Sequence, residues 1–233
     1  SADIAARLKR SLNELQGAFF DVHESRVDYQ AMKGSQRYER YLQLTGELRQ
    51  FDPSILETDP KKKAFWINIY NILVIHGVCH FNVNRSVRQV TRFFSRLGYT
   101  IGGHFFSADD IEHGILRANR PMPGVRGRRF KEDDPRIRLA VGQCDFRIHF
   151  ALVCAASSCP PIEFYDADRI DAQLDVAGRS FLNRRGLTLD RSRAVLYLSR
   201  VFQWYADDFG GDMDRQAEKI MRYTDEQTRA YYD

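Results

Sequence analysis

The chain has 233 residues, of which 43% are hydrophobic and 28% are charged. This size is enough to bury a core, and the composition excludes a disordered, collagen-like or low-complexity protein, so we expect a single domain over residues 1–233. The 35 basic and 31 acidic residues give a formal net charge of +4. They are spread along the chain, which predicts no nucleic-acid partner.

The most apolar stretch, Ala64 to Phe81, is interrupted by Asn68, Asn71 and His76. A membrane-spanning helix needs about 18 uninterrupted apolar residues, so we expect this stretch to be a buried helix and no segment to cross a membrane. The first residues, Ser1 to Ile4, lack the basic and apolar regions of a signal peptide, so we expect one to have been removed or never to have existed. The compartment stays open.

The first fifty residues are expected to form helices. Apolar residues recur every three or four positions from Ile4 to Phe19, and a second helix is predicted from about Gln36 to Phe51. Asp59 as a cap, with Pro60 in the first turn, begins a third helix that continues to about His80.

The middle of the chain mixes helices with one hairpin. A helix is predicted over Ser86–Leu97, and alternation around a Gly-Gly pair predicts a hairpin over Tyr99–Phe106. Ser107 to Asp110 resembles a capping box and begins a helix that runs through Leu116. The segment from Asn119 to Asp134 is rich in Arg, Pro and Gly, which predicts a surface loop that forms a lid or the wall of a cleft.

The core of a sheet is predicted next. Alternation over Ile137–Val141 and the apolar run Ile148–Cys154 indicate two buried strands. A helix from Ile170 to Phe181, a hairpin over Leu187–Leu198 and short helices from Val201 and from Asp214 complete the chain. The predicted class is α+β, with a helical N-terminal part packed on a small, mainly antiparallel sheet.

The most informative segment runs from Arg147 to Pro161, because it contains His149, Cys154 and Cys159. A cysteine nucleophile needs a nearby base, and the base needs a third group that orients it. Cys154 lies in the predicted strand and is expected in the core. Cys159 follows the strand in a loop of small residues before two prolines, where a reactive thiol has a fixed direction. A stiff turn with a half-buried thiol explains Cys159 equally well.

Four further residues are candidates for the same site. Glu112, His113 and Arg117 share a predicted helix, where they supply an acid, a base and a clamp for an anion. The alternative is a solvated face with one ion pair. Asn71, in the apolar helix, needs a polar partner, either a neighbouring loop or a catalytic imidazole that it orients. His149, in turn, could be a satisfied core residue.

Two other kinds of site are weaker alternatives. A zinc ion could be bound by nitrogen and sulfur ligands from His104, His113, His149, Cys154 and Cys159. The spacing of these residues does not match a known zinc motif, so we predict no metal and no cofactor. The basic residues Arg126 to Lys131 are followed by acids, which favours a solvated loop over a nucleic-acid site. With three of the four cysteines within sixteen residues, we expect mostly free thiols.

Four ordered blocks of this sequence resemble the domain of unknown function 547 family, at Ala64–Asn71, Asp110–Arg117, Arg147–Pro161 and Val201–Phe209. The resemblance places the family core at residues 59–210, with an N-terminal helical extension over 1–58 and a C-terminal helix over 211–233. Members of this family occur in bacteria, often as exported proteins, and in plants at the C-terminal end of longer proteins, and the resemblance favours a bacterial protein here. This sequence departs from relatives that have Asn-Cys-Gly, because it has Val-Cys-Ala at 153–155. The residues that match its motif positions are Asn71, Glu112, His113, Arg117, His149, Ser158, Cys159 and Pro160.

Helices that lead into a sheet with a histidine and a thiol also resemble, at fold level only, the papain and transglutaminase type of α+β fold, with a permuted chain order. The predicted function is a cysteine-dependent hydrolase or acyl-transfer enzyme acting on a peptide or isopeptide bond of a protein partner. The alternatives are a non-catalytic peptide-binding module with a buried polar network and, third, a zinc site. The oligomeric state stays open. The predicted catalytic residues are Cys159, His149, His113, Glu112 and Asn71, and the predicted substrate-binding residues are Arg117, Ser158 and Trp66.

Overall fold

The computed structural model describes residues 3–21, 26–83, 86–153 and 163–232. Helices dominate it, and the strands form three separate two-stranded antiparallel hairpins, so the predicted α+β class is confirmed. The α-helices are α1 (Ile4–Ala18), α2 (Tyr29–Lys33), α3 (Gln36–Gly46), α4 (Asp59–His80), α5 (Phe93–Arg96), α6 (Ile148–Ala151), α7 (Ile170–Phe181), α8 (Val201–Trp204), α9 (Met213–Met221) and α10 (Glu226–Tyr232).

The other elements are short. Two π-helices are η4 (Asp110–Leu116) and η7 (Leu182–Gly186). The 3₁₀-helices are η1 (Glu47–Gln50), η2 (Pro53–Ile55), η3 (Val87–Gln89), η5 (Pro135–Leu139) and η6 (Ala167–Arg169). The hairpins pair β1 (Phe20–Asp21) with β2 (Arg26–Val27), β3 (Gly98–Ile101) with β4 (His104–Ser107), and β5 (Leu187–Asp190) with β6 (Val195–Leu198).

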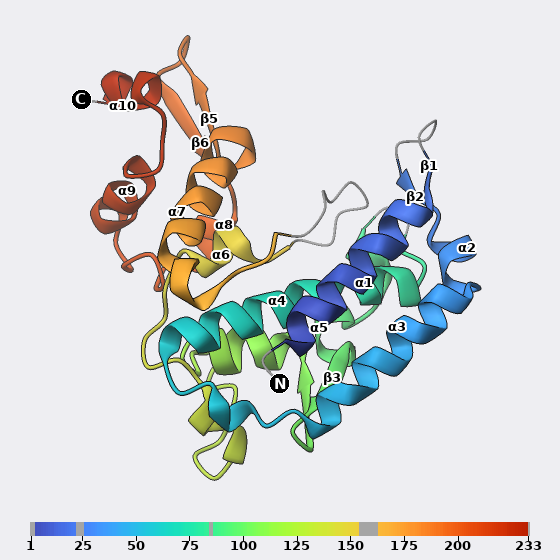
Figure 1. The fold of residues 1–233 in the computed structure, drawn as a ribbon. Helices are drawn as coiled ribbons and strands as arrows, with labels where there is room; N and C mark the ends of the chain where they lie inside the picture. Colours follow the sequence, from blue (N-terminus) through green and yellow to red (C-terminus); the bar gives the residue numbers. More distant parts are fainter. Residues whose placement is uncertain (1–2, 22–25, 84–85, 154–162, 233) are drawn as a thin grey trace.

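Helix α4 is the central element of the fold. Pro60 occupies the first turn, as predicted, but the predicted cap is wrong by one residue: Thr58 caps the helix by accepting from the N–H of Lys61, and Asp59 is the first helical residue. Nearly all of its side chains from Ala64 to Cys79 are buried, because α1, η4, η6 and α7 pack around it. Figure 1 shows α4 crossing the middle of the molecule, with α1 and α3 alongside it. Within the described ranges, no helix is both long and apolar enough to span a membrane.

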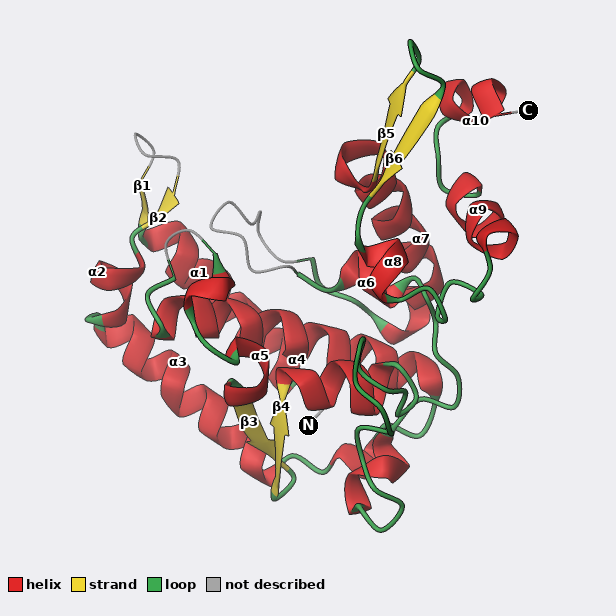
Figure 2. Ribbon diagram, turned by 180° about the vertical axis from the view of Figure 1, so that it is seen from behind, coloured by secondary structure: helices red, strands yellow, loops and turns green. Residues whose placement is uncertain are grey.

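The C-terminal part has an apolar cluster of its own, made by Leu182, Phe202, Phe209, Ile220 and Tyr223. They lie in η7, in α8, in the turn after α8, in α9 and just after α9, in that order. Figure 2 shows this part, with the hairpin β5–β6, standing away from α1 and α3. The segment predicted as one C-terminal helix contains two, α9 and α10.

Two predicted strands are wrong. In place of the first, residues 137–139 belong to the 3₁₀-helix η5. This helix begins at Pro135, and the Asp134 side chain caps it by accepting from the N–H of Arg136 at 2.9 Å. The first four residues of the apolar run after Arg147 form the short helix α6, which packs on α7, and Cys154, at the end of the run, lies outside the described residues. A short apolar run does not distinguish a buried strand from a buried helix, and here the helix is formed.

Two predicted helices differ from the structure only in detail. The predicted helix over 36–51 changes to 3₁₀ geometry after Gly46. The one over 86–97 is broken into η3 and α5, because Arg92 takes a left-handed conformation with φ of 56°. Both predicted hairpins, around Gly102-Gly103 and over 187–198, are confirmed.

Candidate functional site

The first part of the site is the π-helix η4, and its beginning follows from the sequence. The predicted capping box is present: the N–H of Ser107 donates to the Asp110 carboxylate at 3.0 Å, and the N–H of Asp110 donates to the Ser107 hydroxyl at 3.1 Å. All seven residues of η4 are buried. Glu112 and His113 therefore lie inside the protein, and the solvated-face alternative is wrong for them.

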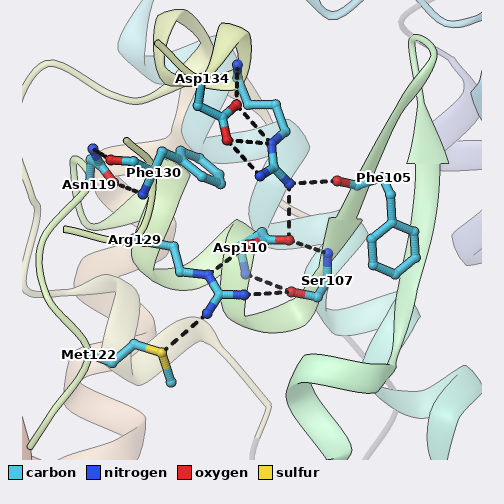
Figure 3. A network of polar contacts seen from close by, with 9 residues as sticks. Phe105, Ser107, Asp110, Asn119, Met122, Arg129, Phe130 and Asp134 are labelled. Carbon is cyan, nitrogen blue, oxygen red and sulfur yellow. Dashed lines mark hydrogen bonds and ion pairs between the residues drawn. The ribbon is translucent and has the colours of Figure 1, made fainter. Parts of the chain in front are cut away.

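The loop after η4 is fixed by the arginine network of Figure 3. Arg129 donates to Asp110 at 2.7 Å, and Arg136 donates to Asp110 at 3.2 Å and to the carbonyl of Phe105 at 2.8 Å. The Asn119 side chain both donates to and accepts from the backbone of Phe130. These contacts attach the predicted loop over 119–134 to η4 and to the hairpin β3–β4.

Asp208, in the turn after α8, is the centre of the site. Its carboxylate is inaccessible to solvent and accepts hydrogen bonds from three side chains. Arg117 donates through Nε at 2.5 Å and through Nη2 at 3.2 Å, and Arg120 donates at 2.8 Å. The Nε2 atom of His149 lies 2.8 Å from Oδ2. Asp208 therefore joins η4, the following loop and α6 at one point.

The charge on Asp208 fixes the state of His149. Burial opposes ionisation of the carboxyl, but the hydrogen bonds from His149 and Arg117 outweigh burial and lower the pKa of Asp208. An ionised carboxylate only accepts, so Nε2 of His149 carries the hydrogen in this contact. In the neutral ring Nδ1 keeps its lone pair, and it has no hydrogen bond to the described parts of the chain.

His113 is held differently, by a cation. Nη1 of Arg117 lies 2.9 Å from Nδ1 of His113, and a guanidinium only donates, so Nδ1 accepts. Burial lowers the pKa of His113 to about 4, which keeps the ring neutral at pH 7. Its Nδ1 lone pair is thus already occupied.

Glu112 contacts two phenols. The hydroxyl of Tyr70 donates to Oε2 at 3.1 Å, and that of Tyr205 donates to Oε1 at 2.5 Å. The ring of Tyr205 stacks on His149, with 3.9 Å between the ring centroids. Glu112 therefore contacts His149 only indirectly, through the Tyr205 ring, whereas Asp208 is hydrogen-bonded to the imidazole itself.

Asn71 contacts backbone, not an imidazole. Its Oδ1 accepts from the N–H of Val153 at 3.0 Å, and its Nδ2 donates to the carbonyl of Ala151 at 3.0 Å. Asn68, one turn earlier on α4, makes the same pair of bonds with the N–H and the carbonyl of Tyr165, at 2.9 and 2.8 Å. The two buried amides fix the backbone at 151–153 and at 165. Ser158 and Cys159 lie outside the described residues.

Three further predicted residues have clear positions. Trp66 is completely buried and packs beside Phe65 and Phe106, so its surface is not available to a ligand in this conformation.

Cys79 and Cys144 are free thiols, while Cys154 falls in the part of the chain that is not described. In the ranges given above, no group of three or more His, Cys, Asp or Glu side chains is suited to a metal ion.

An open cleft of about 730 Å³ reaches Asp208 from the surface. Arg120 and Cys144 line it beside Asp208, and residues of α9 form another part of its wall. Burial and then the Asp208 charge raise the pKa of Cys144 to about 12, so this thiol is protonated at neutral pH. Arg120 makes the loop that follows η4 a wall of this cleft, as predicted.

Asp208, Tyr205 and Tyr70 are not among the residues predicted from the sequence. A signal was present, because Tyr205 and Asp208 belong to the fourth block that resembles the family, Val201–Phe209. No spacing rule connects Asp208 with His149, since 59 positions separate them in the chain.

Comparison with known proteins gives one match. Residues 54–182, more than half of the chain, match the family described as "Protein of unknown function, DUF547". Three of the four resembling blocks lie inside this range, and the block that contains Asp208 lies beyond it. No curated protein and no solved structure shows significant similarity. The chain belongs to the DUF547 family of proteins of unknown function.

Proposed function

We propose that this protein is a cysteine-dependent hydrolase or acyl-transfer enzyme that acts on a peptide or isopeptide bond. In this proposal Cys159 is the nucleophile and His149 is its base. The observation that carries it is the buried pair of His149 and Asp208, because an ionised carboxylate at Nε2 leaves Nδ1 free to take a proton and stabilises the imidazolium that results.

The proposed reaction has two steps. Nδ1 of His149 takes the proton of the Cys159 thiol, and the thiolate attacks the carbonyl carbon of the substrate. The tetrahedral intermediate collapses, the C–N bond breaks, and the proton passes from His149 to the leaving amine. Water, or a second amine in acyl transfer, then attacks the thioester and releases the thiol. Backbone N–H groups near Ser158 and Cys159 are proposed to stabilise the oxyanion.

The bonds around the site support a division of roles. We propose His149 rather than His113 as the base, because the Nδ1 lone pair of His113 accepts from Arg117. Arg117 is also bonded to Asp208 and to the carbonyl of Pro121, so its proposed role is to position these groups rather than to clamp a substrate. Asn71 is proposed to position the backbone that leads from His149 toward Cys159.

The pH dependence of alkylation at each cysteine tests this proposal. Iodoacetamide labelling is mapped by mass spectrometry on the parent and on the His149→Ala, Asp208→Asn and His113→Ala variants. An unperturbed thiol titrates near about 8.5, and a pair with His149 is expected to lower the pKa of Cys159 by one unit or more. Only the first two variants are expected to abolish this shift. Cys79, whose pKa burial raises to about 11 and which does not contact Asp208, is the internal control.

A Cys159 thiol that titrates normally in all four proteins would rule out cysteine catalysis. The second candidate, a peptide-binding module with a buried polar network, is favoured by one observation: Asp208, Glu112 and Arg117 all make their hydrogen bonds within the protein. A binding module keeps its partner after Cys159→Ser. The papain-like chain order, with the histidine before the thiol, stays a prediction.

A further inference from the structure

One wall of the cleft beside Asp208 is a basic face of α9. Arg215, Lys219 and Arg222 are spaced by four and three positions, and all three line the cleft. Residues with this spacing lie on one side of a helix. The opposite side of α9 buries Ile220 in the C-terminal apolar cluster, so the direction of the basic face is set by packing.

The position of Arg215 is also set by the backbone before the helix. Gly210 has φ of +120°, and a Cβ atom at this residue would lie 2.7 Å from Cβ of Arg215. The close approach therefore requires glycine at this position. Asp212 caps α9 by accepting from the N–H of Arg215 at 2.8 Å.

The positive charge of this face is only partly neutralised, because of its three cations Arg215 alone has an ion pair among the described residues, with Asp212 at 3.4 Å. Among the described side chains that line the cleft, six are basic and four are acidic. Two of the acids neutralise the three basic residues that do not belong to the α9 face: Asp208 pairs with Arg120, and Asp145 pairs with Lys63 and Arg147. Within the described chain, Lys219 and Arg222 have no carboxylate at ion-pairing distance. They lie over the rings of Phe146 and Tyr223, and Lys219 also donates to the backbone carbonyl of Asp208 at 3.5 Å.

The spacing of these cations indicates the shape of the anion. Arg222 directly follows α9 and keeps helical backbone angles, so at 1.5 Å rise per residue Arg215 and Arg222 are about 10 Å apart along the helix axis, with Lys219 between them. Same-side residues of an extended chain are about 7 Å apart, so alternate carboxylates of an extended acidic peptide span a comparable length.

We propose that this cleft binds an acidic, extended segment of the peptide substrate through Arg215, Lys219 and Arg222. The proposal rests on the proposed function, because it takes the ligand to be the substrate of the site built on Asp208. It adds a specificity to that site: carboxylates of the peptide lie along α9, next to the Asp208 carboxylate that holds His149.

Binding of labelled peptides to a Cys159→Ala protein tests this without catalysis. Fluorescence polarisation compares a peptide of alternating Glu and Ala with its Gln counterpart. The acidic peptide is expected to bind about tenfold more tightly, with affinity falling as salt rises. The Lys219→Glu and Arg222→Glu double variant is expected to lose about tenfold in affinity for the acidic peptide. A double Gln variant, which is gentler on folding, is expected to lose less.

The control carries the same charge reversal elsewhere. Arg126 and Lys131 are exposed on the loop after η4 and do not line the cleft. Their double Glu variant is expected to bind the acidic peptide within about twofold of the parent. Equal affinity for the two peptides, equal loss in both double variants, or binding of inorganic pyrophosphate in place of the peptide would overturn the proposal. Because the alkylation experiment tests Cys159 and His149 separately, failure of one proposal is distinguishable from failure of the other.

Discussion

Asp208 is a single residue that determines the chemistry of its surroundings. Its buried negative charge is compensated by Arg117 and Arg120, and it fixes which nitrogen of His149 carries hydrogen. Burying such a charge without partners costs several kcal/mol, so the carboxylate and its donors stabilise the protein only together. The chemistry available to His149 thus depends on a residue that lies 59 positions away.

Removing this charge is expected to destabilise the protein strongly. Asp208→Asn leaves Arg117 without its buried partner, and we expect the free energy of unfolding in urea to fall by about 3–5 kcal/mol. The neighbouring Asp207 is exposed, and Asp207→Asn is the matched control, expected to change stability by less than about 0.5 kcal/mol. Equal effects of the two substitutions would show that the Asp208 network does not stabilise the fold.

At the scale of the element, η4 depends on a close contact with the loop that follows it. A Cβ atom at Gly114 would lie 2.3 Å from the ring of Phe130. Phe130 is buried, its backbone is held by Asn119, and the Arg136 guanidinium lies over its ring at 4.4 Å. The ring therefore has little room to move away. Packing of this kind keeps Glu112 and His113 directed into the site.

Two glycine substitutions separate this contact from helix propensity. Gly114→Ala is expected to lower the free energy of unfolding by about 1–3 kcal/mol, because the methyl group overlaps the Phe130 ring. Gly17→Ala, in α1 with nothing within 4 Å of the new methyl group, is expected to raise it by up to about 1 kcal/mol. Chemical denaturation measures both. A neutral or stabilising effect of Gly114→Ala would contradict the assigned contact.

At the scale of the whole molecule, buried polar groups make the stability depend on pH. Burial lowers the pKa values of His76 and His113 to about 4, from 6.5 in an unperturbed histidine. The unfolded chain therefore binds more protons between these values, and the folded state loses stability as the pH falls through this window. Asp145, with a pKa lowered to about 2 mainly by Arg147 and Lys63 against the opposing effect of burial, adds a loss below its ordinary 3.8.

Urea unfolding at several pH values checks this expectation. We expect the free energy of unfolding to fall by a few kcal/mol between about pH 7 and about pH 4.5, and the slope to be shallower in His76→Gln. His76 lies near Tyr41 and is hydrogen-bonded to Tyr99, away from the proposed catalytic residues, so the variant removes a buried titratable group without touching the proposed site. A stability that is constant over this range would contradict the neutral, buried state of these histidines.

Local signals in the sequence determined several parts of the fold. The Asp59-Pro60 start of α4, the Gly-Gly turn of β3–β4 and the capping box before η4 each depend on residues a few positions apart. The grouping of Glu112, His113 and Arg117 follows from the same short-range order. Such signals are local because a cap or a turn satisfies the backbone groups of its own segment.

Only the tertiary structure decided what these residues contact. Asp208 meets Arg117 across 91 positions, and Asn71 meets Val153 across 82. The run from Ile148 is a helix because of what packs on it, since an apolar run is compatible with either a strand or a helix. Long-range pairs of this kind depend on how the elements pack, and no pattern within a single segment encodes them. The sequence alone therefore named His149 as a candidate, and only the fold places the Asp208 carboxylate beside it.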